Sequence, residues 1–129
     1  FHEASQNNDA PVTLWGSGNP MREFLHVYDL AQAVIFALEN VLPEYLYNVG
    51  TGTDVSIKNL AKIIQETTGH RGDIIWDASK PDGTPRKWMD SSKMHALGWQ
   101  PTYPLKEGIM QTYAWFNRQL DEQKTIKYF

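Results

Sequence analysis

The sequence predicts an α/β fold in a single domain. Short β-rich segments alternate along the chain with segments of helical periodicity, a pattern typical of mixed α/β proteins. The 129 residues are 41% hydrophobic and 21% charged, and no internal repeat or low-complexity tract interrupts them. A chain of this length can form one compact unit that buries about two-thirds of the surface of the extended chain.

The first predicted elements are two strands separated by a turn. Phe1 lies within a helical pattern, and residues 12–15 form a β-rich run. Two glycines, an asparagine and a proline within residues 16–20 predict a sharp turn. Residues 22–27 predict a second strand, because apolar and polar side chains are interleaved there.

A helix and a third strand follow. Asp29, with Gln32 three residues later, is predicted to cap a helix that runs from Leu30 to about residue 40. This helix is apolar almost all round, so we expect it to be buried on more than one side. Residues 45–49 predict a strand that ends at the turn of residues 50–52.

The second half of the chain begins with a helix that has clear signals at both ends. Ser56 is predicted to cap it, and Gly69 to end it. Residues 57, 60, 61, 64 and 68 fall on one face at helical spacing.

The remaining elements are one strand and two helices. Residues 73–77 predict a strand, which leads into a polar loop at residues 78–85. A short helix over residues 92–97 is closed by Gly98. Pro104 marks the start of the last helix, where its missing N–H costs nothing.

Composition and charge argue against several classes of partner. The formal net charge of −3 argues against binding to nucleic acid, which needs many cations that face phosphates. No apolar run reaches the roughly 20 residues of a membrane span. The chain has no cysteine, and its four histidines lack the spacing of a metal site. We therefore expect a cytoplasmic protein with no nucleic-acid, membrane or metal partner.

Residues 79–90 hold the densest group of side chains that could bind a ligand. Lys80, Arg86 and Lys87 lie near Asp82 on a loop that two prolines restrict. Arginine and lysine can clamp phosphate oxygens, and Asp82 could accept hydrogen bonds from ribose hydroxyls or from a base. The alternative is a solvated surface loop.

A second candidate cluster flanks the turn of residues 16–20. Trp15 precedes this turn and Arg22 follows it. An indole ring can pack on a base or sugar, and a nearby guanidinium can pair with an anion. The alternative is a β-hairpin that carries an incidental aromatic side chain.

No catalytic set is visible in the sequence. The turn of residues 48–52 lacks the third glycine of the dinucleotide-binding pattern, because Val55 takes that position. We interpret this segment as a strand-to-helix turn. The chain has neither a Gly-x-Ser-x-Gly elbow nor a Tyr-x-x-x-Lys pair. We therefore predict no catalytic and no cofactor-binding residue.

Four short segments form a family pattern along the chain. They are Arg-Glu-Phe-Leu-His-Val with a later Asp (residues 22–29), Tyr-Asn-Val-Gly (47–50), Asp-x-x-Lys (90–93) and Leu-Gly-Trp-x-Pro (97–101). The pattern resembles the C-terminal part of extended short-chain dehydrogenase/reductases that act on nucleotide sugars. Two longer stretches, residues 12–24 and 77–90, are similar to the GDP-L-fucose synthase family. The resemblance covers residues 1 to about 120.

The resemblance implies a substrate site and an activity. The family positions that match Trp15, Arg22 and Asp82 contact the GDP-sugar, and the position that matches Lys87 faces it; Arg86 is a further candidate cation. The implied reaction converts GDP-4-keto-6-deoxy-D-mannose to GDP-L-fucose by epimerisation at C3 and C5 and reduction at C4 by NADPH. The family's catalytic residues and its NADPH site belong to an N-terminal dinucleotide-binding domain outside these 129 residues.

Two alternatives stay open at this point. One is the same region of another nucleotide-sugar epimerase or dehydratase, although such relatives do not usually carry the run of residues 80–87. The other is a non-catalytic binding module. The resemblance also implies a homodimeric full-length enzyme. We expect the chain alone to be inactive, and to associate through the apolar helix of residues 30–38 if that helix is exposed.

Overall fold

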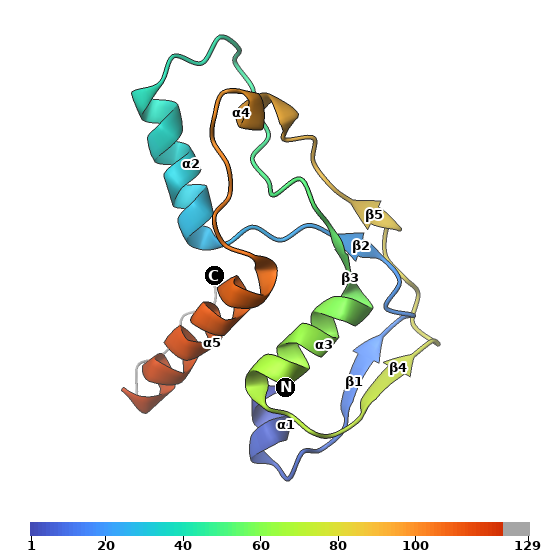
Figure 1. Ribbon diagram of the computed structural model, residues 1–129. Coiled ribbons are helices and arrows are strands. Elements are labelled where there is room, and N and C mark those ends of the chain that lie inside the picture. Colours follow the sequence, from blue (N-terminus) through green and yellow to red (C-terminus); the bar gives the residue numbers. More distant parts are fainter. Residues whose placement is uncertain (123–129) are drawn as a thin grey trace.

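The computed structural model describes residues 1–122, in which helices and short strands alternate (Figure 1). The helices are α1 His2–Gln6, α2 Val27–Glu39, α3 Ile57–Thr68, α4 Ser92–Ala96 and α5 Leu105–Asp121. The strands are β1 Val12–Trp15, β2 Met21–Arg22, β3 Val55–Ser56, β4 Ile74–Asp77 and β5 Arg86–Lys87. The α/β prediction is confirmed.

The strands form two small sheets. β1 pairs with β4 in parallel, which confirms the strands predicted at residues 12–15 and 73–77. In the second sheet, β2 lies between β3 and β5, antiparallel to β3 and parallel to β5. Figure 1 shows the two sheets on the side of the molecule away from α2.

The start of α2 differs from the prediction. The predicted strand of residues 22–27 is too long, because β2 ends at Arg22 and the helix already begins at Val27. Asp29 is not the helix cap: His26 takes that position, and its Nδ1 accepts a hydrogen bond from the backbone N–H of Tyr28 (3.4 Å). Asp29 lies inside the first turn of α2 and is buried.

The buried Asp29 carboxylate connects α2 to the segment before α5. It accepts hydrogen bonds from the backbone N–H groups of Thr102 (2.8 Å) and Tyr103 (3.0 Å), and from the Thr102 hydroxyl (2.8 Å). The capping-box prediction failed because the carboxylate is used for a contact between distant segments rather than within its own helix turn.

The strand predicted at residues 45–49 is also wrong. A strand needs a hydrogen-bonding neighbour, and the described part of the chain offers none to this segment. Tyr45 and Leu46 are exposed, while Tyr47 and Val49 pack against the core.

Helices α3 and α5 begin where the sequence predicts. The Ser56 hydroxyl accepts a hydrogen bond from the backbone N–H of Asn59 (3.1 Å), and Gly69 ends α3 in the left-handed conformation with φ of 71°. α5 starts directly after Pro104 and packs against α3. The short helix α4 is followed by Gly98, also left-handed.

The hydrophobic core of the described residues is small. Its buried cluster consists of Ala33 of α2, Met94 of α4 and Trp99, and Ala61 of α3 is buried as well. α2 contributes one side only, and Leu30, Val34 and Leu38 are exposed. The prediction that this helix is buried on more than one side is therefore wrong.

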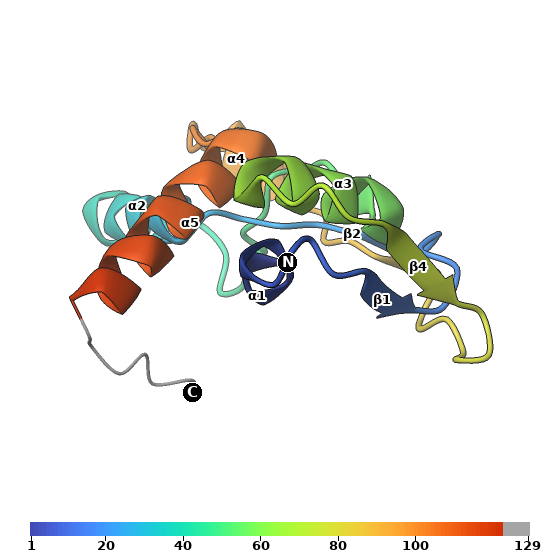
Figure 2. The same ribbon diagram turned by 90° about the horizontal axis from the view of Figure 1, so that it is seen from below.

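The elements spread into an open arrangement (Figure 2). The accessible surface is 9237 Å², whereas a compact monomer of 14.8 kDa exposes about 7,000 Å². The chain therefore buries less than the two-thirds of its extended surface that its length predicts. None of the described helices combines the length and the apolar character needed to cross a membrane.

Candidate functional site

Strand β2 brings the two candidate clusters together. It pairs Arg22 with Lys87 of β5 on one side and with Val55 of β3 on the other. Directly paired residues on neighbouring strands project from the same face of a sheet, so Arg22 and Lys87 are neighbours. One guanidinium nitrogen of Arg22 donates to the carbonyl of Met21 (2.6 Å). Within residues 1–122, the Lys87 side chain has no ion-pair or hydrogen-bond partner.

Arg86 projects from the opposite face, because successive side chains of a strand alternate. Its guanidinium binds the Asp54 carboxylate through Nε (2.5 Å) and Nη2 (3.3 Å). It also lies 4.8 Å from the ring centre of Trp88, two residues further along the chain. Asp54 therefore neutralises Arg86, and the structure separates Arg86 from Arg22 and Lys87.

Asp82 connects its loop to the turn after β1. Its carboxylate accepts hydrogen bonds from the backbone N–H of Ser17 (2.8 Å) and from the Ser17 hydroxyl (2.6 Å). The fit is tight at Gly16, where a Cβ would lie 2.3 Å from Asp82 Oδ1, and φ of +79° favours glycine. The hydrogen bonds from Ser17 lower the pKa of Asp82, so its carboxylate is charged at neutral pH.

Trp15 presents an open aromatic face near this turn. Its side chain is 74% exposed, and the Lys80 ammonium lies 5.7 Å from the centre of its ring. An exposed indole can stack on a flat ring of a ligand, and a neighbouring ammonium can pair with a phosphate attached to that ring.

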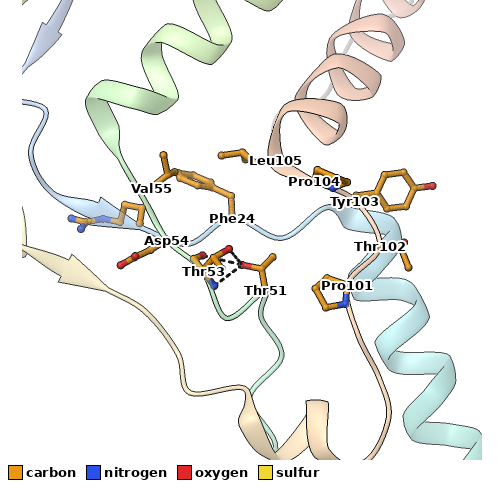
Figure 3. Close-up of a pocket in the computed structure, with 11 residues that line it drawn as sticks. Phe24, Thr51, Thr53, Asp54, Val55, Pro101, Thr102, Tyr103, Pro104 and Leu105 are labelled. Carbon is orange, nitrogen blue, oxygen red and sulfur yellow. Dashed lines mark hydrogen bonds between the residues drawn. The ribbon is translucent and has the colours of Figure 1, made fainter.

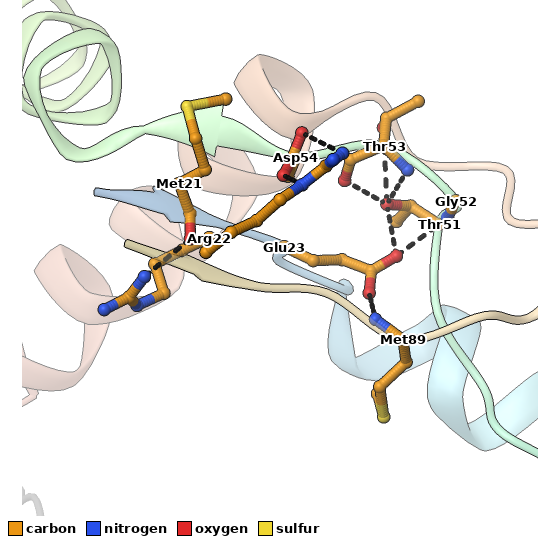
Figure 4. Close-up of polar contacts among 9 residues, drawn as sticks. Met21, Arg22, Glu23, Thr51, Gly52, Thr53, Asp54 and Met89 are labelled. Carbon is orange, nitrogen blue, oxygen red and sulfur yellow. Dashed lines mark hydrogen bonds and ion pairs between the residues drawn. The ribbon is translucent and has the colours of Figure 1, made fainter. Parts of the chain in front are cut away.

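Glu23 connects three segments, as Figure 4 shows. Its Oε1 accepts hydrogen bonds from the backbone N–H of Gly52 (2.7 Å) and the hydroxyl of Thr51 (3.2 Å), and its Oε2 accepts one from the backbone N–H of Met89 (3.3 Å). Neither Glu23 nor Asp54 is among the predicted site residues.

The turn of residues 50–52 does not fit a cofactor phosphate. The N–H of Gly52 already donates to the Glu23 carboxylate, whose negative charge repels a phosphate. The interpretation of residues 48–52 as a strand-to-helix turn is wrong, because residues 45–49 form no strand and β3 stands between this turn and α3. Within the described residues, no three metal-ligating side chains lie close enough to hold an ion.

A pocket of about 310 Å³ adjoins β2 (Figure 3). Its lining residues include Arg22, Phe24, Asp54 and Tyr103. A larger apolar groove of about 680 Å³ runs between α3 and α5 and is lined by none of the predicted site residues.

Comparison with known proteins matches this chain to enzymes of nucleotide-sugar metabolism. Residues 1–50 match the NAD dependent epimerase/dehydratase family. The chain is 54% identical over 116 residues to a protein named probable GDP-L-fucose synthase 1 of Oryza sativa subsp. japonica; the match covers 90% of this chain and 35% of that protein.

The chain resembles GDP-L-fucose synthases over nine-tenths of its length.

Solved structures agree on the fold. A GDP-L-fucose synthetase from Naegleria fowleri bound to NADP superposes with a TM-score of 0.85 at 27% identity, over 93% of this chain and 38% of that one. UDP-glucose 4-epimerase of Thermotoga maritima superposes with a TM-score of 0.78 at the same identity and coverage. The chain has the α/β fold of the C-terminal portion of extended short-chain dehydrogenase/reductases, and it spans little more than a third of these relatives' length.

In the structure, the predicted site residues fall into three groups. Arg22 and Lys87 are neighbours on one sheet face, Trp15 and Asp82 lie at the adjoining turn, and Arg86 is paired with Asp54 on the other face. Glu23 was missed because its partners lie 28 to 66 residues further along the chain. The one local feature that could have pointed to Glu23 is its position directly after the predicted site residue Arg22.

Proposed function

We propose that this chain is the GDP-sugar-binding part of a GDP-L-fucose synthase. The whole enzyme would convert GDP-4-keto-6-deoxy-D-mannose to GDP-L-fucose, with epimerisation at C3 and C5 and reduction at C4. The observation that carries the proposal is the parallel pairing of β2 with β5, which makes Arg22 and Lys87 neighbours. Two adjacent cations suit the two phosphates of a nucleoside diphosphate.

Three further residues support the same assignment. Trp15 offers an exposed ring for a base or sugar, and Lys80 adds a cation beside it. Asp82 holds its loop against the turn after β1 through Ser17. This contact holds the loop of residues 78–85 in place near Trp15 and Lys87. A loop that is already fixed favours binding, because it loses less conformational freedom when the ligand binds.

The proposal assigns ligand binding, and no chemical step, to this chain. The 129 residues contain no cysteine and no Tyr-x-x-x-Lys pair, the residue types that the family uses for epimerisation and reduction. NADPH would be bound by protein outside these residues, since the turn of residues 50–52 already uses its N–H group. We propose that the chain alone does not convert GDP-4-keto-6-deoxy-D-mannose, and that the complete enzyme is a cytoplasmic homodimer.

A nucleotide titration tests the binding assignment. GDP and UDP are added separately to the isotope-labelled chain, and NMR shifts give both the dissociation constant and the residues affected. We expect GDP to shift residues 15–22 and 80–88 and to bind more tightly than UDP. Arg22→Ala and Lys87→Ala should each weaken GDP binding about ten- to a hundred-fold, the loss expected for a charged hydrogen bond.

Lys106→Ala is the matched control, because this exposed lysine pairs with Glu66 on the α3–α5 side of the molecule. It should leave the affinity for GDP unchanged. Equal affinity for UDP and GDP would favour another nucleotide-sugar epimerase or dehydratase. No binding of either nucleotide would favour a non-catalytic interaction module.

A further inference from the structure

The segment that carries Lys87 is attached to the rest of the molecule on both sides of that lysine. On one side, Asp54 binds the guanidinium of Arg86. On the other side, Glu23 accepts a hydrogen bond from the backbone N–H of Met89. Lys87 itself has no side-chain partner among residues 1–122, so its position depends on these two neighbouring attachments and on the pairing of β5 with β2.

The carboxylate of Glu23 sits in a closely fitted place. A Cβ added at Gly50 would lie 2.7 Å from Glu23 Oε1 and 2.8 Å from the Ser91 hydroxyl. Its other hydrogen bonds, from Gly52 and Thr51, hold the side chain in one orientation. Glu23 follows Arg22 directly, so one short stretch of chain presents the guanidinium to the sheet face and fixes the segment that bears Lys87.

We propose that Glu23 is a positioning residue for the diphosphate-binding pair Arg22 and Lys87. This inference rests on the proposed function. Glu23 contacts no ligand itself; it holds residues 86–89 so that the Lys87 ammonium is already beside Arg22 before the nucleotide arrives. An attachment of this kind raises affinity because the loop loses less freedom on binding.

The substitution Glu23→Gln tests this role with little change in size. Its amide oxygen can still accept the hydrogen bond from Gly52, but its NH₂ group cannot accept the one from Met89. We expect the affinity for GDP to fall about 2- to 10-fold, the effect of one hydrogen bond, and the Met89 amide to exchange faster with solvent. Glu66→Gln, which removes an exposed carboxylate of α3, should change neither quantity.

A double-mutant cycle separates positioning from general loss of structure. If Glu23 acts through Lys87, then Glu23→Gln should have no further effect on GDP affinity in the Lys87→Ala background. Additive effects would overturn the inference, as would wild-type GDP affinity for Glu23→Gln. Should Glu23→Gln fail to fold by circular dichroism, Glu23→Asp, which is one methylene too short to keep both attachments, takes its place in the same cycle.

The failure of this inference is distinguishable from the failure of the proposed function. If the wild-type chain binds GDP and the Glu23 variants bind it equally well, only the positioning role is wrong. If the wild-type chain binds neither GDP nor UDP, the proposed function is wrong and the positioning role falls with it.

Discussion

At Asp29, burial and hydrogen bonding act on one carboxyl group in opposite directions. Burial raises the pKa because it disfavours the charged form, but the hydrogen bonds from Thr102 and Tyr103, together with nearby His26, lower the pKa below its ordinary value of 3.8. The charged form is therefore favoured in the folded chain. Asp29 stabilises the fold by attaching α2 to the start of α5.

A pH dependence follows from this shift. Because the pKa of Asp29 is lower in the folded chain, its contribution to stability is fully present above about pH 4, near the pKa of the unfolded chain. It is lost as the pH falls through the folded pKa. We expect Asp29→Asn to cost about 2–3 kcal/mol at pH 7 and to make unfolding less dependent on pH below 4. Urea unfolding at pH 7, 4 and 3 measures both effects, and an unchanged free energy of unfolding at pH 7 would contradict them.

At the candidate site, the sequence predicts individual residues but not the contacts that position them. Arg22, Lys87, Trp15 and Asp82 were predicted as site residues from their chemistry and from family resemblance, and their role stays a prediction. The partners that determine their geometry were not found. Glu23 reaches Met89 across 66 residues, and nothing in the local sequence around either residue indicates that contact.

At the scale of elements, prediction succeeded where the signal is local. α3 was predicted at both ends because Ser56 and Gly69 act within one helical turn of the helix. The predictions for Asp29 and for residues 45–49 failed because the outcome depends on distant partners: Asp29 binds Thr102, and residues 45–49 have no neighbouring strand among the described residues. The alternation of apolar and polar residues in one segment does not show whether a second strand lies beside it.

The cap of α3 gives a prediction at this scale. Ser56→Ala removes the acceptor for the Asn59 N–H and should lower the free energy of unfolding by about 1 kcal/mol. Ser56→Asp keeps an oxygen acceptor at the same place and should stay close to the wild type. Thermal unfolding followed by circular dichroism measures both variants, and equal losses for Ala and Asp would rule out a capping role.

At the scale of the whole molecule, the accessible surface of 9237 Å² exceeds the surface expected for a compact chain of 14.8 kDa by about 2,000 Å². Several of the exposed large apolar side chains lie on α2, among them Leu38, which is 82% exposed. A surface of this kind is typical of a face that contacts other protein.

Self-association of the purified chain is the expected consequence. Light scattering over a range of concentrations should show a mass that rises above 14.8 kDa. Replacing Val34 and Leu38 with lysine should shift the equilibrium towards the monomer. Because both positions are exposed, each substitution should change the free energy of unfolding of the monomer by no more than about 0.5 kcal/mol. A wild-type chain that stays monomeric at the highest concentration would contradict the prediction.

The hydrogen bonds of Asp29 also constrain the order in which the chain can fold. Its partners are made 73 and 74 residues later, and ribosomes add about 5–20 residues per second. About 4–15 seconds therefore pass between the synthesis of Asp29 and that of Thr102. During that interval α2 can form as a helix, but it cannot make this attachment, which forms only after Thr102 and Tyr103 have been synthesised.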